Sequence, residues 1–440
     1  MGKGKIGLRI WERNASSTKM IMIAVLAMLL LIPAAMIVNL IHERECRKAA
    51  VTQEIGNKWG QEQTVTGPLI RIPYLEKVIN SEGREIVRRQ EIYLLPETLD
   101  IMAGVDSSAR YRGIYEAVVY SSDIRMQGRF DLKLLTQSGV VNGDILFKEA
   151  TILLGMTDMK GVRDQIVASV NGQALEMNPG VHGEAVASSV GAPLDDLRTM
   201  EELTFDFALN LNGNGQLRFV PVGKVTRLEM TSPWNTPSFN GSFLPVEREI
   251  TENGFRASWK VLHFNRNLPQ VWTGCPIDFG QYAFGVSFII PADIYQQATR
   301  TAKYAIMFIG FTFSAFFLAE TLTRQRLHPV QYLLIGLALV LFYVLLISIS
   351  EHLTFAYAYM VSTVATIALI SSYAISVLRS KRMGMVVASI LAGLYGYMYV
   401  ILNLEDYSLL MGAIGLFAVL AAIMYLTRRI DWYADAVEAN

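Results

Sequence analysis

The strongest constraint on this chain is the placement of its long apolar segments. One segment stands alone near the N-terminus, from Met20 to Leu40, and the others crowd the C-terminal third. Each has close to the ~20 residues that an α-helix needs to cross about 30 Å of hydrocarbon. Lipid offers the backbone no hydrogen bonds, so the segments are expected to be helices. The later segments are Tyr304–Ala319, Val330–Ile349, Leu353–Val377, Met383–Leu404 and Tyr407–Leu426.

Basic residues orient these segments, because short loops rich in Lys and Arg stay in the cytoplasm. Lys or Arg residues precede the first segment and follow the second, fourth and sixth, whereas the loops at 350–352 and 405–406 have neither. This alternation predicts six spans with both termini in the cytoplasm. The basic residues are Lys3, Lys5, Arg9, Arg13, Lys19, Arg324, Arg326, Arg379, Lys381, Arg382, Arg428 and Arg429.

The expected fold is therefore an α-helical polytopic membrane protein with a large extracytoplasmic domain. The first segment is longer than the roughly 7–15 residues of a signal-peptide core, which favours an uncleaved anchor. The domains run as a cytoplasmic N-terminus (1–19), an anchor helix (20–41), an extracytoplasmic domain (42–302), a five-helix membrane bundle (303–427) and a cytoplasmic tail (428–440).

The extracytoplasmic domain has the pattern of a β protein. Asn-Gly dipeptides, which favour the positive φ angles of two-residue hairpins, recur from Asn142 to Gly254. Apolar residues alternate with polar ones along 205–219 and 255–261, as in half-buried strands. These signals predict an antiparallel, mainly-β, sandwich-like domain, with a short helix at Leu194–Leu203.

Composition narrows the partners. The formal net charge is zero, which gives no indication of a nucleic-acid partner. The bilayer itself is the partner that the long apolar segments predict. The two cysteines, Cys46 and Cys275, are both predicted outside the cytoplasm. A disulfide in an oxidising compartment and two unpaired thiols both remain open.

No catalytic motif stands out, so no enzymatic activity, cofactor or metal is predicted. The sequence contains no G-x-S-x-G elbow, P-loop or H-E-x-x-H pair. The nearest cluster is His42-Glu43-Arg44-Glu45-Cys46, which is either a set of metal ligands or the charged boundary where the first helix leaves the lipid. The boundary interpretation is preferred, because no second ligand pair lies nearby in sequence.

Acidic residues mark the predicted outer end of the bundle. Glu351 and His352 form one turn, and Glu405 and Asp406 precede the last helix. Carboxylates at a helix N-terminus complement the macrodipole, which explains the second pair structurally. A functional interpretation joins the four residues into one outer-face polar patch, with Arg300 and Lys303 as cationic partners.

The fifth predicted helix carries small residues every four positions, at Gly384, Ala388, Ala392 and Gly396. Such a stripe allows another helix to approach closely. Gly412, Gly415, Ala418 and Ala422 offer a similar surface on the sixth helix.

Segments along most of the chain after the first helix carry a resemblance to a known family. They are WGQEQTVTGPLIRIPY (Trp59–Tyr74), SSDIRMQGRFDL (Ser121–Leu132), SPWNTPSFNGSFLP (Ser232–Pro245), FNRNLPQVW (Phe264–Trp272), HPVQYLLIGLALVLFYVLLISISEH (His328–His352), LEDYSLLMGA (Leu404–Ala413) and TRRIDWY (Thr427–Tyr433). These segments resemble the CreD family of bacterial inner-membrane proteins, also called the Cet colicin-tolerance family. The resemblance implies a multi-pass inner-membrane protein linked to envelope integrity, with a periplasmic envelope component as its expected partner and no accepted catalytic residues or ligand.

Two functions compete. The first is a non-enzymatic inner-membrane protein that supports envelope integrity through binding by its β domain. The second is a transporter or lipid-handling membrane enzyme that uses the outer-face acidic residues of the bundle.

The orientation can be tested with reporter fusions. A reporter that is active only in the periplasm should give a strong signal when fused near Gly180 and none when fused after Asn440, because the charge pattern places these sites on opposite sides. Reversed signals would contradict the orientation.

Overall fold

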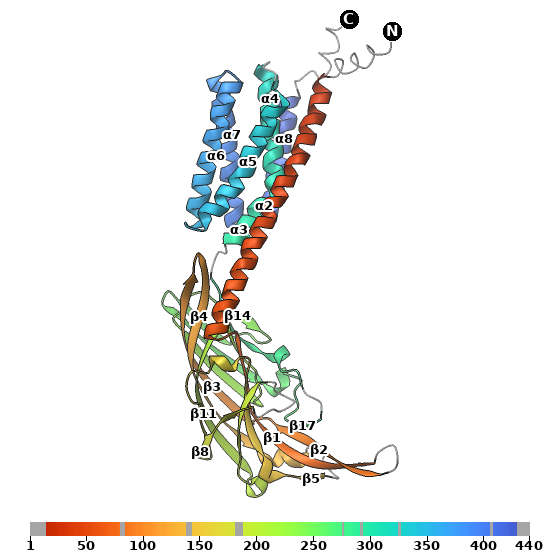
Figure 1. Cartoon of the computed structure of the whole chain (residues 1–440), viewed down its shortest axis with the longest axis vertical. Helices are drawn as coiled ribbons and strands as arrows, with labels where there is room; N and C mark the ends of the chain where they lie inside the picture. Colours follow the sequence, from red (N-terminus) through yellow and green to blue (C-terminus); the bar gives the residue numbers. More distant parts are fainter. Residues whose placement is uncertain are drawn as a thin grey trace. The chain divides into compact units, whose positions relative to one another are not determined.

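The computed structural model describes residues 15–79, 84–137, 143–180, 188–274, 277–290, 294–323, 327–404 and 408–428. The chain forms two compact units (Figure 1). A helical unit combines Met1–Arg47 with Ala292–Asn440, and a β unit comprises Lys48–Pro291. These limits differ from the expected 42–302, because the first helix continues past residue 42 and a further helix begins before residue 302.

The helical unit contains long apolar helices. Within the described residues, four are long and apolar enough to cross a membrane, and α3 with part of α4, bent by 45°, would make a fifth. The sixth span expected at 407–426 stays a prediction. The helices are α2 (Ala15–Trp59), α3 (Ile294–Lys303), α4 (Ala305–Thr323), α5 (Pro329–Ser350), α6 (Phe355–Val377), α7 (Lys381–Asn403) and α8 (Ser408–Thr427).

Helix α2 is much longer than the predicted anchor of 20–41. It runs unbroken through Pro33 to Trp59. Leu30 of α2 is buried against Gly336 of α5, where a side chain on the glycine would overlap the leucine. The first helix therefore packs on the other helices of its unit rather than standing apart as a bare anchor.

Aromatic side chains fill the centre of this helical unit. The ring of Tyr395 on α7 lies 4.8 Å from that of Phe342 on α5 and 4.8 Å from that of Phe308 on α4. Tyr359 of α6 donates a hydrogen bond to the carbonyl of Tyr395 over 2.7 Å. Four helices thus meet around one tyrosine.

The β unit confirms the mainly-β prediction for the long polar segment between the first and second apolar segments. Short 3₁₀ turns separate some of its strands, and one of them, Leu197–Thr199, replaces the helix expected at Leu194–Leu203. The strands are β1 (Gln63–Ile79), β2 (Glu85–Leu94), β3 (Thr98–Arg112), β4 (Tyr115–Asp131), β5 (Gly143–Ile145), β6 (Thr151–Met156), β7 (Val167–Val170), β8 (Gln173–Glu176), β9 (Asn178–Pro179), β10 (Ser189–Pro193), β11 (Glu202–Asn214), β12 (Gln216–Phe219), β13 (Val225–Ser232), β14 (Pro237–Gly241), β15 (Glu247–Thr251), β16 (Gly254–Leu262), β17 (Val271–Thr273) and β18 (Phe284–Phe288).

The strands form two sheets that share one hydrophobic core. Among the described residues, the first sheet has ten strands along the path β14-β18-β12-β1-β6-β10-β9, with β2, β17 and β5 branching from it. The second has eight, in the order β15-β16-β13-β3-β4-β11-β7-β8. Aromatic rings from the two sheets touch, as where Tyr120 of β4 meets Phe288 of β18 at 5.3 Å and Phe239 of β14 meets Phe255 of β16 at 5.7 Å.

The Asn-Gly signals had mixed outcomes. Asn171 and Gly172 form the two-residue turn between β7 and β8, both with positive φ, as that turn requires. The alternation from Phe255 to Val261 also holds, because Phe255, Ala257, Trp259 and Val261 are all buried. Around Gly215, by contrast, the chain makes no hairpin but passes from the eight-stranded sheet to the ten-stranded one.

The last turns of α2 are fixed to the strands of the β unit. The indole of Trp59 donates a hydrogen bond to the carbonyl of Tyr120 over 3.0 Å, and the guanidinium of Arg110 lies 5.4 Å from the indole ring. Glu54 pairs with Arg112 of β3, and this bond to the guanidinium lowers the pKa of the glutamate carboxyl.

One buried arginine joins two loops of the β unit, the one between β12 and β13 and its own between β16 and β17. The side chain of Arg266 donates hydrogen bonds to the carbonyls of Val222 (2.7 Å), Gly223 (2.9 Å) and Leu268 (3.3 Å) and to the amide oxygen of Gln270 (2.7 Å). Only 5% of the residue is exposed, and burial lowers the pKa of its guanidinium to about 10. Its partners are neutral oxygens, so it acts as a hydrogen-bonding hub.

Replacing this hub should destabilise the β unit. We expect Arg266→Met to lower the free energy of unfolding by about 2–4 kcal/mol, because it leaves several buried carbonyls unpaired. The change can be measured from tryptophan fluorescence during denaturant unfolding of the full chain in micelles. Arg227→Met, which removes an exposed ion pair with Asp100, is the control and should cost under about 1 kcal/mol. Equal effects of the two substitutions would contradict the prediction.

Candidate functional site

Of the predicted outer-face patch, Glu351 is the residue with described partners. It caps the C-terminal end of α5, and its side chain is 11% exposed. One carboxylate oxygen lies 3.6 Å from a guanidinium nitrogen of Arg44 on α2 and accepts a hydrogen bond from the Tyr295 hydroxyl of α3 over 3.5 Å. Glu351 therefore links three helices, and its cationic partner comes from the cluster that the sequence assigned to the lipid boundary.

The rest of the patch is not assembled by the described contacts. His352 follows Glu351 but is exposed. Glu405 and Asp406 lie outside the described residues, so their contact with Arg300 and Lys303 stays a prediction. Cys275 also lies outside them, and Cys46 is an exposed free thiol.

The small-residue stripe of α7 lies only partly on the buried face of that helix. Gly384 is buried against Ile375 of α6, whereas Ala392 and Gly396 are exposed and Ala388 is half-buried. The buried face carries larger residues instead, including Val387, Leu391, Tyr395 and Met398. Along most of the stripe, the expected close approach of a helix is thus not seen among the described contacts.

Helix α8 meets α7 through a glycine, as the small residues on α8 suggested. The ring of Tyr397 on α7 packs on Gly415 so closely that a side chain on this glycine would overlap it. The Tyr397 hydroxyl also donates a hydrogen bond to the carbonyl of Met411. The larger partner in this contact is Tyr397, which the spacing of small residues in the sequence does not reveal.

A second acidic residue of the helical unit is buried. Glu320, near the end of α4, is 8% exposed. It accepts hydrogen bonds from the backbone N–H of Leu327 over 3.2 Å and from the Tyr332 hydroxyl over 3.0 Å. These bonds connect the end of α4 to the start of α5, which is a structural role.

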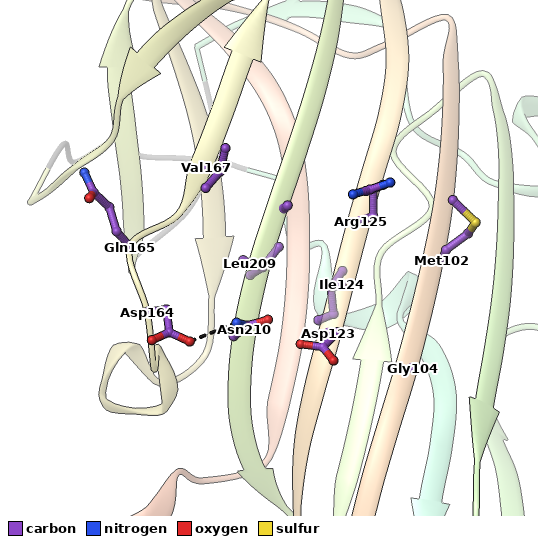
Figure 2. Close-up of a pocket in the computed structure, with 11 residues that line it drawn as sticks. Met102, Gly104, Asp123, Ile124, Arg125, Asp164, Gln165, Val167, Leu209 and Asn210 are labelled. Carbon is purple, nitrogen blue, oxygen red and sulfur yellow. Dashed lines mark hydrogen bonds between the residues drawn. The ribbon is translucent and has the colours of Figure 1, made fainter.

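The eight-stranded sheet of the β unit carries two adjoining hollows. A groove of about 550 Å³ lies on the outer face of the eight-stranded sheet, across β3, β4 and β11 (Figure 2). A second hollow of about 560 Å³ adjoins it across β13 and β16, and Gly104 and Asp123 line both. None of the motifs described above marks this face in the sequence.

Charged and polar side chains surround the first groove. Asp123 and Arg125 project from alternate positions of β4, and both are exposed. On the far wall, the amide of Asn210 donates a hydrogen bond to the carboxylate of Asp164 over 2.8 Å (Figure 2). The exposed side chains of Met102 and Val167 add apolar surface. The groove therefore combines a carboxylate, a guanidinium and an amide on one face of the sheet.

The described residues contain no group of three or more His, Cys, Asp or Glu side chains placed to hold a metal ion. The cluster at 42–46 lies on α2, where His42 approaches Glu45 at 3.6 Å within one turn of the helix. This contact is a local side-chain pair of the kind expected at helix surfaces.

These features define a membrane protein with several membrane-capable helices and a large β unit. The family described as "Inner membrane protein CreD" matches residues 15–433. The "Inner membrane protein CreD" of Escherichia coli (strain K12) is 38% identical over 414 residues, which cover 92% of this chain and 91% of that protein. The chain therefore belongs to the CreD family, as the sequence segments suggested.

Comparison with solved structures adds no functional information. The yeast LTA4 hydrolase in complex with bestatin is 9% identical, with a TM-score of 0.19, over 51% of this chain and 35% of that one. A similarity of this size supports neither a fold nor a functional argument.

The contact at Gly384 gives a test of helix packing. Gly384→Leu should destabilise the helical unit by roughly 1–3 kcal/mol, because its side chain would overlap Ile375. Gly396→Leu is the matched control on the same helix, since a side chain there would meet no atom within 4 Å. Unfolding in mixed micelles of increasing SDS content measures both. Greater damage from the control would contradict the placement of Gly384 on the packed face of α7 and of Gly396 on its exposed face.

Proposed function

We propose that this protein is a non-enzymatic inner-membrane protein that supports cell-envelope integrity through binding by its β unit. In this proposal six helices cross the inner membrane, both termini are cytoplasmic, and the β unit is a sandwich in the periplasm. The partner is a periplasmic component of the envelope. Membership of the CreD family and the membrane-capable helices support the location.

The observation that carries the binding role is the groove across β3, β4 and β11. It is an open surface on a rigid sheet, with Asp123 and Arg125 exposed within it. Ligand sites commonly place a few polar groups on such a pre-formed scaffold. Beneath the groove the same strands bury Ala103, Ile124 and Leu209 in the core.

The rival function, a transporter or lipid-handling enzyme that uses outer-face acids, receives less support. Its central residue, Glu351, is engaged by Arg44 and Tyr295. The contacts of this carboxylate with a guanidinium and a hydroxyl join α2, α3 and α5, and this structural role is enough to explain an acidic residue at that position.

Complementation separates these two functions. In a strain that lacks the chain, we expect a variant combining Glu351→Gln, Glu405→Gln and Asp406→Asn to restore resistance to detergent and β-lactam stress as well as the unaltered chain does. The expectation follows from a function that resides in the β unit and needs no acid at the end of the bundle.

Immunoblotting of membrane fractions provides the control, because it shows whether the variant accumulates normally. Loss of resistance at a normal protein level would favour the transporter or enzyme and overturn the proposed function. A strain carrying the vector alone sets the baseline for both measurements.

A further inference from the structure

Gly104 occupies a position in β3 where neither packing nor backbone geometry requires glycine. Met102, Gly104 and Asp106 point outward, while Ala103 and Val105 are buried. A Cβ atom built on Gly104 would meet nothing within 4 Å. Its pairing with Asp123 of β4 continues the regular register, without a bulge.

A glycine inside a strand loses stabilisation compared with a residue that has a side chain, and it often marks a place where a ligand approaches closely. Strain, a bulge and a crowded neighbour do not explain this glycine. Because Gly104 has no side chain, the space where the first groove meets the adjoining hollow stays open.

Cross-strand pairs of polar side chains flank the two outward positions of β4, Asp123 and Arg125, that line the first groove. Along one neighbouring row, Arg227 pairs with Asp100 at 3.1 Å and Gln127 donates to Asp206 over 2.7 Å. Along the row on the other side, Ser121 donates to Asn212 over 2.7 Å. Such cross-strand pairs are the usual way in which a sheet face is stabilised.

Between these rows, Asp123 and Arg125 make no hydrogen bond or ion pair within the part of the chain that the structure describes. They occupy alternate positions of one extended strand, so their Cα atoms lie roughly 6.6 Å apart. Gly104 lies beside Asp123 and Ala208 lies beside Arg125 in the register, which leaves room next to each charge.

The geometry points to a zwitterionic ligand of the short-peptide class, and this inference rests on the binding role proposed above for the β unit. An ammonium group of the ligand binds the Asp123 carboxylate, and a carboxylate of the ligand binds the Arg125 guanidinium through its two-pronged geometry. A dipeptide backbone spans a separation of this size. A neutral ligand would leave both unpaired charges without ionic partners.

The adjoining hollow provides room for a longer peptide. It lies beyond Gly104, where Thr231 and Arg256 face outward from β13 and β16. Arg256 is already paired with Glu229, so the Asp123 and Arg125 pair remains the recognition centre. A peptide held there would pass over Gly104, which explains why a side chain is missing at that position.

Saturation-transfer NMR on the full chain in nanodiscs tests this inference. The probe is unblocked alanyl-alanine, and N-acetyl-alanyl-alanine amide is the uncharged comparison. We expect saturation transfer to the unblocked dipeptide only. Gly104→Val and Asp123→Asn should each weaken its binding at least tenfold, because the first fills the groove and the second removes the partner of the ammonium.

Ser108→Val is the matched control, since Ser108 also faces outward on β3 but does not line either groove. It should leave binding unchanged. Gly104→Val should unfold at the same or a higher denaturant concentration than the unaltered chain, because valine suits a strand better than glycine. That result would separate a blocked groove from a misfolded protein.

Absence of saturation transfer to the unblocked dipeptide, or equal transfer to the unaltered chain and Gly104→Val, would overturn the inference. Binding of N,N′-diacetylchitobiose that Gly104→Val abolishes, without dipeptide binding, would overturn it in favour of a saccharide. Neither result would remove the proposed envelope function, which the complementation experiment measures independently of the ligand.

Discussion

The backbone's need for hydrogen-bond partners is the constraint on which both units of this protein depend. Buried N–H and C=O groups are costly when unpaired, both in lipid and in a protein core. In the helical unit each helix satisfies its own backbone, so side chains such as Tyr395 are free to decide the packing. In the β unit the backbone hydrogen bonds form between neighbouring strands, so residues far apart in sequence must meet. Carbonyls in the loops of the β unit lack strand partners, and the guanidinium of Arg266 donates hydrogen bonds to two of them.

This difference explains which parts of the fold the sequence revealed. The helices are local objects, and long apolar runs were enough to place α5, α6 and α7 within a few residues of their observed limits. The two-residue turn at Asn171-Gly172 is equally local. The Asn-Gly dipeptide at Gly215 does not form a hairpin, although the alternation of apolar residues continues on both sides of it. The strands before and after it join different sheets, and which sheet a strand joins depends on partners elsewhere in the chain. The length of α2 was missed because its last turns are polar and are held by strand residues such as Tyr120.

The candidate sites follow the same rule. Glu351 was recognised from its position at a helix end, but its partner Arg44 lies on a helix more than 300 residues earlier in the sequence. The small residues of α7 gave a regular period, yet burial follows Leu391 and Tyr395, whose size fills the centre of the unit. A period of small residues shows where close approach is sterically allowed, and it does not show whether a neighbouring helix uses that surface.

One residue of the groove on the eight-stranded sheet, Gly104, can be placed from the sequence, but its neighbours can be identified only from the structure. In β3 the buried residues Ile101, Ala103 and Val105 alternate regularly, which assigns Gly104 to the outer face. Sequence alone cannot show that Asp123 stands beside this glycine, because their pairing depends on the register of β3 with β4. Since that register is fixed by buried residues on the opposite face, a shift of one position would turn the core outward. The packing of the core therefore holds Gly104 beside Asp123, so that a ligand would meet an arrangement already formed.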